Sequence, residues 1–259
     1  MIHSTAIIEK SAKIDKDVQI GAHVVISGNV TIKSGAIIDH HAFIDCITEI
    51  GHDVHIHPFA SVGSIPQDLK FKKGEPSYCF VGDRTVIREF TAINSGTGVD
   101  TPTRIGSDCL LMAYAHLGHN ASIGNGVIIA NAGTIAGHVE IADNVIIGGL
   151  TGIHQFVHIG ELVIVGGCSK VVKDIPPYML VDGNPSRVRS INTIGLQRKG
   201  YSKEVLSKLK DAFKILYKKG MTFSKAQSTL QKKLGDTLEV QKIISFIDNS
   251  ERGLTGGKR

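Results

Sequence analysis

The chain has 259 residues, of which 42% are hydrophobic and 20% are charged, a balance typical of a folded globular protein. Its apolar runs are only a few residues long, far short of the ~20 residues that cross a bilayer. No positively charged start leads into an apolar leader either. These features predict a cytoplasmic protein without stable membrane insertion. The cysteines form no Cys-x-x-Cys pair, so we expect them to be reduced and structural: Cys46, Cys79, Cys109 and Cys168.

The net charge of +5 conceals an asymmetry along the chain. Residues 1–186 hold 12 Lys/Arg against 18 Asp/Glu, a net charge of −6, whereas residues 187–259 hold 17 against 6, a net charge of +11. A positive field of this kind attracts nucleic acid, anionic lipid or an acidic protein. A solvated, lysine-rich helical surface with no partner explains the count equally well.

An internal repeat runs along most of the sequence. Aliphatic residues recur at every sixth position over 27 positions, in two series separated by one break: Ile2, Ile8, Ile14, Ile20, Ile26, Ile32, Ile38, Ile44, Ile50, Ile56 and Val62, then Val81, Ile87, Ile93, Val99, Ile105, Leu111, Leu117, Ile123, Ile129, Ile135, Ile141, Ile147, Ile153, Ile159, Val165 and Val171. A period of six fits neither an α-helix nor a simple strand, but it fits a triangular solenoid with six residues per side. The sequence therefore predicts a mainly β fold, a parallel β-helix with 18 residues per coil.

The break in the series indicates a loop. Val81 follows Val62 by 19 positions, which is out of register with the period, and we expect a looped-out segment at residues 64–79. The run from Gly96 to Thr103 also has the composition of a loop. Val99 lies in this run, so we interpret its place in the six-residue series as a coincidence.

The repeat ends at Pro176 and Pro177, because two successive prolines cannot continue a β ladder. We expect the β-helix to occupy residues 1–186 and a small α-helical domain to occupy residues 187–259. An apolar stripe predicts one helix that begins after Ser202 and ends before Gly220, and weaker patterns predict helices at residues 222–234 and 237–249. Such a domain covers the open end of the prism, which otherwise exposes unpaired strand edges.

Four of the 12 histidines are predicted to gather on one edge of the prism. Leu117, Ile135 and Ile153 are 18 residues apart and therefore stack on neighbouring coils, so the histidines beside them fall within roughly 10 Å of one another: His116, His119, His138 and His154. Such a cluster suits zinc binding or general-base catalysis, and the ordinary imidazole pKa near 6.5 favours a base at neutral pH. We expect the histidines outside this cluster to be structural: His40, His41, His52, His55 and His57.

Several motifs resemble those of the acyl-[acyl-carrier-protein]:UDP-N-acetylglucosamine O-acyltransferases, a hexapeptide-repeat family. They are Pro66-Gln67-Asp68-Leu69-Lys70, Ala115-His116-Leu117-Gly118-His119-Asn120, Ile135-Ala136-Gly137-His138-Val139, Ile153-His154-Gln155-Phe156, Val165-Gly166-Gly167 and Asp174-Ile175-Pro176-Pro177-Tyr178. The resemblance implies a left-handed parallel β-helix, a homotrimer, and no cofactor or metal. It also implies transfer of a 3-hydroxyacyl chain from acyl carrier protein to the 3-position of UDP-N-acetylglucosamine, the first step of lipid A synthesis.

The resemblance assigns roles to individual residues. It implies that His119 is the general base and that the N–H of Gly137 forms the oxyanion hole. It implies that Gly167, with Ile164, limits the length of the acyl chain. The substrate-binding positions that it implies are Asp68, Lys70, His116, His138, His154, Gln155, Asn192, Arg198 and Lys199.

This chain departs from the family pattern at four positions. Asn120 replaces an Asp beside the base, Lys199 replaces an Arg, Ile194 replaces a carboxylate, and Lys170 fills a usually small position. An amide orients an imidazole but cannot neutralise an imidazolium, and a lysine keeps the charge of an arginine but loses its bidentate fork.

Three other interpretations stay open at this point. The chain could be a purely structural β-helix, an N-acyltransferase of the same fold, or a scaffold that uses its basic tail to bind nucleic acid. Related N-acyltransferases carry an extra domain before the repeats, whereas the period of this chain begins at Ile2. The tail offers few aromatic residues for base stacking, which nucleic-acid binding would use. Both observations favour the O-acyltransferase.

Overall fold

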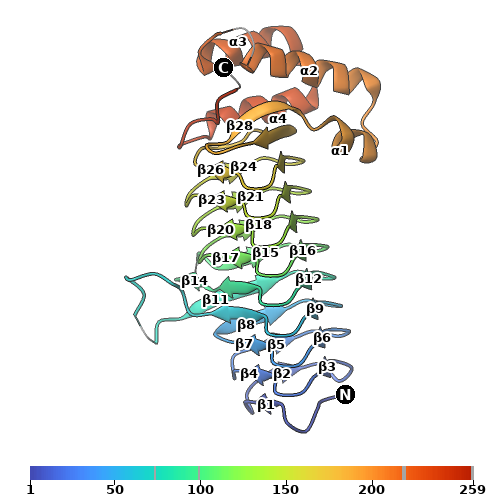
Figure 1. Ribbon diagram of the computed structural model, residues 1–259, viewed down its shortest axis with the longest axis vertical. Helices are drawn as coiled ribbons and strands as arrows, with labels where there is room; N and C mark the ends of the chain where they lie inside the picture. Colours follow the sequence, from blue (N-terminus) through green and yellow to red (C-terminus); the bar gives the residue numbers. More distant parts are fainter. Residues whose placement is uncertain (73, 99, 218–219, 258–259) are drawn as a thin grey trace.

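The computed structural model describes residues 1–72, 74–98, 100–217 and 220–257. The chain forms a tall three-sided prism with helices at its C-terminal end (Figure 1). The prism is a parallel β-helix, as the period of six predicts, and it is left-handed, as the family resemblance implies. Each side of the prism is one parallel sheet, and successive strands along the chain belong to successive sides.

Sheet 1 is built, in order, from β1 (Ile7–Ile8), β4 (Val25–Ile26), β7 (Phe43–Ile44), β10 (Ser61–Ser64), β13 (Ala92–Asn94), β17 (His116–Leu117), β20 (Thr134–Ile135), β23 (Gly152–Ile153) and β26 (Lys170–Val171). Sheet 2 is built from β2 (Lys13–Ile14), β5 (Thr31–Ile32), β8 (Ile47–Ile50), β11 (Ser77–Val81), β15 (Thr103–Ile105), β18 (Ser122–Ile123), β21 (Glu140–Ile141) and β24 (His158–Ile159), with β14 (Gly96–Thr97) beside β11. Sheet 3 is built from β3 (Gln19–Ile20), β6 (Ile37–Ile38), β9 (His55–Ile56), β12 (Val86–Ile87), β16 (Leu110–Leu111), β19 (Ile128–Ile129), β22 (Ile146–Ile147), β25 (Ile164–Val165), β27 (Met179–Asp182) and β28 (Arg187–Ile191).

In the regular coils the second residue of each two-residue strand points into the prism, and its partners lie 18 positions before and after it. Leu117 pairs with Ile135, and Ile135 pairs with Ile153. These side chains are almost completely buried, and burial of each aliphatic side chain contributes about 1.5–3 kcal/mol to folding. The first members of the repeat are less buried, and Ile2 is 53% exposed, because no coil lies beneath them. Val99 lies outside the described residues.

The two predicted loops interrupt the stack of coils. Val62 pairs with Ile93, 31 positions later, because the chain leaves the prism between β10 and β11. The described residues 65–72 and 74–76 belong to this excursion. Ser64 and Ser77 to Cys79, which the sequence placed in the loop, belong to strands. Ile93 pairs with Leu117, 24 positions later, which reflects the second loop after β14.

The C-terminal part begins with a strand rather than a helix. β28 lies antiparallel to β27 and extends sheet 3 beyond the last coil. The helices follow as α1 (Thr193–Arg198), α2 (Lys203–Tyr217), α3 (Phe223–Leu234) and α4 (Leu238–Asp248), and they cover the end of the prism (Figure 1). Ser202 caps α2, as predicted, through its side-chain oxygen and the N–H of Val205. No pattern in the sequence predicts α1, which is only 6 residues long.

Candidate active site

The four clustered histidines lie on three neighbouring coils of sheet 1 and in the turns that follow its strands. His116 is in β17, and His119 lies in the turn after that strand. His138 lies in the turn after β20, and His154 follows β23 directly. The rings of His119 and His138 meet edge to face with centroids 5.2 Å apart, which confirms that the period brings them together. We call these turns the histidine edge of the prism: residues 118–121, 136–139 and 154–157.

An amide fixes the orientation and the tautomer of His119. Nδ1 of His119 lies 2.6 Å from Oδ1 of Asn120. The amide group is oriented by its other contacts, because its Nδ2 donates hydrogen bonds to the carbonyl oxygens of Thr97 and Thr101. Oδ1 can only accept, so Nδ1 of His119 carries the proton and Nε2 keeps its lone pair. The second loop therefore prepares His119 to take up a proton at Nε2.

Gly137 lies directly beside this free nitrogen. A methyl group added to Gly137 would lie 2.9 Å from Nε2 of His119, so any larger residue would crowd the imidazole. The N–H of Gly137 donates no hydrogen bond to any other described residue. A glycine that lies beside the lone pair of a histidine and has a free backbone donor suits a reaction in which negative charge develops on an oxygen.

His138 lies between His119 and an aromatic ring. Its ring stacks on Phe156, one coil further on, with centroids 4.7 Å apart. Burial lowers the pKa of His138, the charge of His119 lowers it further, and the carboxylate of Asp68 partly opposes both effects. His138 is therefore a neutral hydrogen-bonding group at pH 7, and the first loop brings Asp68 close enough for its charge to act on this ring.

The other predicted residues on or near the histidine edge differ in exposure. Burial also lowers the pKa of His116, which is half-buried within β17. His154 is exposed, and its Nδ1 lies 3.1 Å from the carbonyl oxygen of Gln155. Lys70 is exposed on the first loop, where its N–H donates to the carboxylate of Asp68.

A second group of predicted residues lies away from the histidine edge. Ile164 is in β25 of sheet 3, and Gly167 is exposed in the turn after that strand. Arg198 ends α1 and Lys199 follows it, both exposed. Asn192 is buried, where Oδ1 caps α1 at the N–H of Gly195 and Nδ2 donates to the carbonyl oxygen of Leu162. One chain therefore carries its predicted site residues on two separate edges.

The histidine edge is not arranged to bind a metal. Within the described part of the chain, the ring nitrogens of His116, His119, His138 and His154 are not among the ligand atoms that converge as a metal requires. Zinc binding at this cluster, which the sequence left open, has no support in the geometry.

Sequence reasoning missed the residues that hold the site together. Thr97, Thr101 and Thr103 position Asn120, the last by accepting a hydrogen bond from its backbone N–H. They lie in or beside an irregular loop, where no period points to them. Phe156 could have been found, because it lies 18 positions after His138 and so stacks above it.

Comparisons with known proteins agree with this geometry. The model of the bacterial transferase hexapeptide (six repeats) matches residues 102–137, and the model of the UDP-N-acetylglucosamine O-acyltransferase, domain 2, matches residues 174–255. The acyl-[acyl-carrier-protein]–UDP-N-acetylglucosamine O-acyltransferase of Synechocystis is 45% identical over 82% of this chain and 78% of its own length. The protein of that name from Burkholderia lata is 42% identical over 79% of this chain and 80% of its own. The crystal structure of the Francisella novicida UDP-N-acetylglucosamine acyltransferase superposes with a TM-score of 0.97 at 34% identity, over 100% of this chain and 95% of that one.

The chain belongs to the UDP-N-acetylglucosamine O-acyltransferase family. It is therefore an acyltransferase on a hexapeptide-repeat β-helix. The interpretations as a purely structural β-helix and as a nucleic-acid scaffold are excluded as its main function.

Three of the four departures in this acyltransferase lie on exposed surfaces, and Lys199, after α1, is one of them. Ile194 is 64% exposed on α1, and Lys170 is exposed at the start of β26. Asn120, in contrast, is 8% exposed and fully engaged in hydrogen bonds. Within the described ranges, no helix combines the length and the apolar character needed to cross a bilayer.

Proposed function

We propose that this chain transfers a 3-hydroxyacyl group from acyl carrier protein to the 3-hydroxyl of UDP-N-acetylglucosamine, the first step of lipid A biosynthesis. The relatives at 42–45% identity carry both substrates in their names. The observation that carries the proposal is the arrangement of His119, whose protonated Nδ1 is bound by Asn120 while Nε2 lies beside Gly137.

The proposed reaction uses His119 as a general base. Nε2 removes the proton of the sugar 3-hydroxyl while the oxygen attacks the carbonyl carbon of the acyl thioester. The N–H of Gly137 donates to the carbonyl oxygen as it becomes negatively charged. The tetrahedral intermediate then collapses, the C–S bond breaks, and the departing thiolate takes the proton from the imidazolium of His119. The catalytic cycle therefore ends with His119 neutral again.

The remaining predicted residues are proposed to bind the substrates. Asp68 and His138 contact the sugar, since His138 lies beside His119 and the charge of Asp68 acts on His138. Arg198 and Lys199 supply positive charge for the diphosphate, together with Lys70 on the first loop. His116, His154, Gln155 and Asn192 stay predictions as nucleotide or sugar contacts, and the buried Asn192 also holds α1 in place.

A homotrimer is proposed because the two groups of site residues lie on different edges of one prism. Gly167 lies in the turn after β25 of sheet 3, whereas His119 lies in the turn after β17 of sheet 1, so the two groups face different edges of the same prism. A neighbouring prism placed against the histidine edge would bring its own Gly167 and α1 to it. An exposed column of Phe59, Phe90, Tyr114 and Leu150 offers an apolar surface for such packing.

The proposed acyl donor also explains the basic C-terminal part. Acyl carrier protein is acidic, and residues 187–259 hold the excess of +11. Lys208 and Lys214 are paired with Glu204 and Asp211 on α2, which reduces their contribution, and Lys218 lies outside the described residues. A cytoplasmic location stays a prediction.

The proposed function is tested with purified enzyme, a panel of acyl carrier protein thioesters, and two acceptors, UDP-N-acetylglucosamine and its 3-amino analogue. Mass spectrometry should show one acyl group on the 3-hydroxyl of UDP-N-acetylglucosamine, with a clear preference for one acyl chain length. Exclusive acylation of the amine would assign the chain to a different acceptor, and no product with either acceptor would overturn the proposal.

The composite site is tested by mixing two inactive variants. His119→Ala and the double variant Arg198→Ala/Lys199→Ala should regain activity when they are mixed and allowed to exchange subunits, if each site takes residues from two chains. Sedimentation should give the mass of three chains. Full activity in a monomeric species would contradict the trimer.

A further inference from the structure

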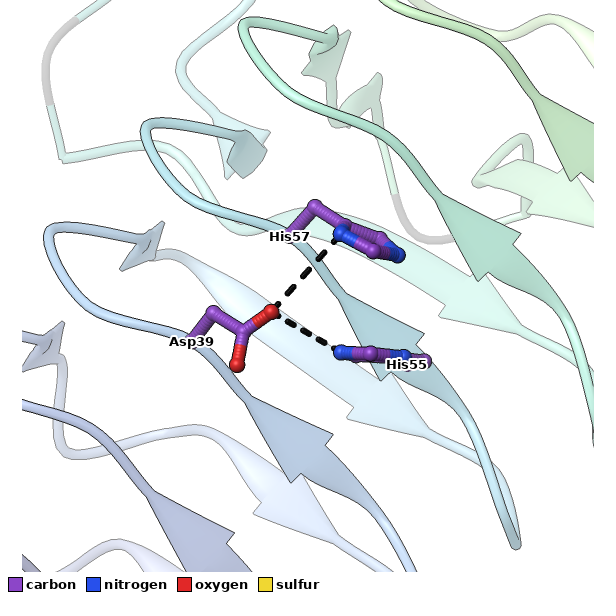
Figure 2. A group of neighbouring side chains, drawn as sticks. All are labelled: Asp39, His55 and His57. Atoms are coloured by element: carbon purple, nitrogen blue, oxygen red, sulfur yellow. Dashed lines mark hydrogen bonds and ion pairs between the residues drawn. The ribbon is translucent and has the colours of Figure 1, made fainter.

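We propose that Asp39, His55 and His57 form a binding site for a divalent transition-metal ion such as Zn²⁺. Figure 2 shows the three side chains pointing toward one another from two neighbouring coils. Their ligand atoms, Oδ2 of Asp39, one ring nitrogen of His55 and one of His57, all lie within 4.8 Å of one another. From sequence we expected both histidines to be structural and the chain to bind no metal, so this proposal departs from that expectation.

The distances suit a tetrahedral ion. Oδ2 of Asp39 lies 2.9 Å from Nε2 of His55 and 3.7 Å from Nδ1 of His57. Ligand bonds of about 2.0–2.1 Å at tetrahedral angles place the ligand atoms about 3.3 Å apart, between the two observed values. The rings of His55 and His57 are stacked with centroids 4.0 Å apart, so the side chains have to rotate to bring all three atoms to bonding distance of one ion.

The backbone holds the three residues at fixed positions. His55 lies in β9, in register with Ile37 of β6, and its N–H donates to the carbonyl oxygen of Thr85. The N–H of Asp39 donates to Ile56, and the N–H of His57 donates to Ile87. The ladder between coils therefore sets the separation of the ligands before any ion binds, which favours binding because little order has to be created.

The surroundings supply a candidate fourth ligand and a competitor for it. Oε1 of Glu89, on the next coil, lies 3.7 Å from Nδ1 of His57. Arg88 binds the same carboxylate through two hydrogen bonds of 2.9 and 3.0 Å, so either Glu89 turns from Arg88 or a water molecule takes the fourth position. Two imidazoles and one or two carboxylates are typical ligands of zinc and neighbouring first-row ions.

The proposed site is open to solvent. The side chains of Asp39 and His55 are about one-third exposed, so an ion can reach them from solvent.

The proposed site is separate from the catalytic residues. Asp39 and His57 begin turns that follow strands of sheet 3, whereas His119 lies in a turn that follows sheet 1. An ion there would join two coils near the open end of the prism and stabilise them. It would act on folding and not on the proposed acyl transfer, so its test does not depend on that proposal.

The proposal is tested on the full chain after removal of metals by a chelator and dialysis. Titration with Zn²⁺ against a competing chromogenic chelator should show one saturable site per chain. His55→Gln and His57→Gln should each weaken binding at least tenfold, and Asp39→Asn should weaken it as well. His52→Gln, an exposed histidine of a different turn, is the matched control and should bind as the unaltered chain does.

A second measurement keeps the proposal falsifiable if a variant folds poorly. Anomalous diffraction from crystals of the unaltered chain with Zn²⁺ should place an ion in contact with Asp39, His55 and His57. The melting temperature should rise with Zn²⁺ in the unaltered chain and in His52→Gln, but not in His57→Gln. Unchanged affinity in the His55→Gln/His57→Gln double variant, or an anomalous peak only at other residues, would overturn the assignment.

Discussion

Two edges of the prism use the same backbone, but only one of them carries the proposed general base. His41 follows sheet 3 and His138 follows sheet 1, with φ angles of 61° and 58°. Each ring stacks on a phenylalanine one coil further on, His41 on Phe59 with centroids at 5.0 Å and His138 on Phe156 at 4.7 Å. The coil geometry therefore produces stacked side chains at both edges, without regard to function.

The two edges differ in the residues that surround His41 and His138. Beside His138 stands His119, whose Nδ1 is bound by Asn120 and whose Nε2 lies beside Gly137. The column that contains His41 continues instead as Phe59, Phe90 and Tyr114, which are exposed rings. A repeat supplies positions for side chains, and a loop inserted between repeats supplies the hydrogen-bond partners that orient His119, the proposed base.

The largest effect is expected where the two edges differ most. His119→Ala should lower kcat by about 10²–10⁴, the usual contribution of a general base, without a change in melting temperature. His41→Ala is the control from the other edge and should leave kcat unchanged. Rates and thermal unfolding of both variants check this, and a near wild-type kcat in His119→Ala would remove His119 from its proposed role.

A glycine comparison tests the space beside the base. Gly137→Ala should lower kcat by about tenfold to a hundredfold, because the added methyl group would displace the imidazole and a misplacement of about 1 Å is costly. Gly152→Ala, on the same sheet, has no atom within 4 Å of the added group and should be neutral. Equal rates in the two variants would show that the contact at Gly137 does not matter.

Asn120 offers a test of how the second loop holds the base. Asn120→Asp would place an oxygen against the carbonyl oxygens of Thr97 and Thr101, and the loss of both donors should cost about 1–3 kcal/mol in the free energy of unfolding. Asn144→Asp, in a turn with a similar φ of 58°, should change it by less than about 0.5 kcal/mol. Urea unfolding measures both, and equal stability would argue against the network.

The acyl-binding edge is tested by chain length. Gly167→Met should reject long acyl chains and accept short ones, because the side chain would occupy the space proposed for the acyl tail. The specificity constants for a panel of acyl carrier protein thioesters measure this change. An unaltered preference would place the limit elsewhere, with Lys170 as the first residue to examine.

The smallest effect concerns the basic part of the chain. The KM for acyl carrier protein should rise severalfold between 0.1 and 1 M salt, since the Debye length falls from about 10 Å to about 3 Å. The KM for the sugar nucleotide should respond less. Charge reversal at Lys208 or Lys214 should weaken carrier-protein binding without changing kcat, and indifference to both treatments would leave these lysines as a solvated surface.

The sequence predicts the prism well because each coil repeats the same physical requirement. A branched aliphatic residue at every sixth position is buried in the interior of the prism, so the register of Leu117, Ile135 and Ile153 follows directly. The closeness of His119 and His138, which meet edge to face, follows from the same period. In contrast, the hydrogen bonds of Asn120 to Thr97 and Thr101 depend on the path of an irregular loop, which no period specifies.

The cluster of Asp39, His55 and His57 was missed for a different reason. Asp39 and His57 are 18 positions apart and stack as the period requires, but each residue taken alone resembles an ordinary surface group. Only the side-chain directions bring three ligand atoms to one point. Sequence periodicity predicts which coils meet, and the structure shows which side chains do.

Chemical rescue tests the proposed role of His119 most directly. Exogenous imidazole should restore part of the activity of His119→Ala, with a rate that rises with the concentration of neutral imidazole and therefore with pH through about 7. The unaltered enzyme and His41→Ala should not respond. The account is contradicted if His119→Ala keeps the wild-type rate, or if imidazole has no effect on its residual acyl transfer at any pH.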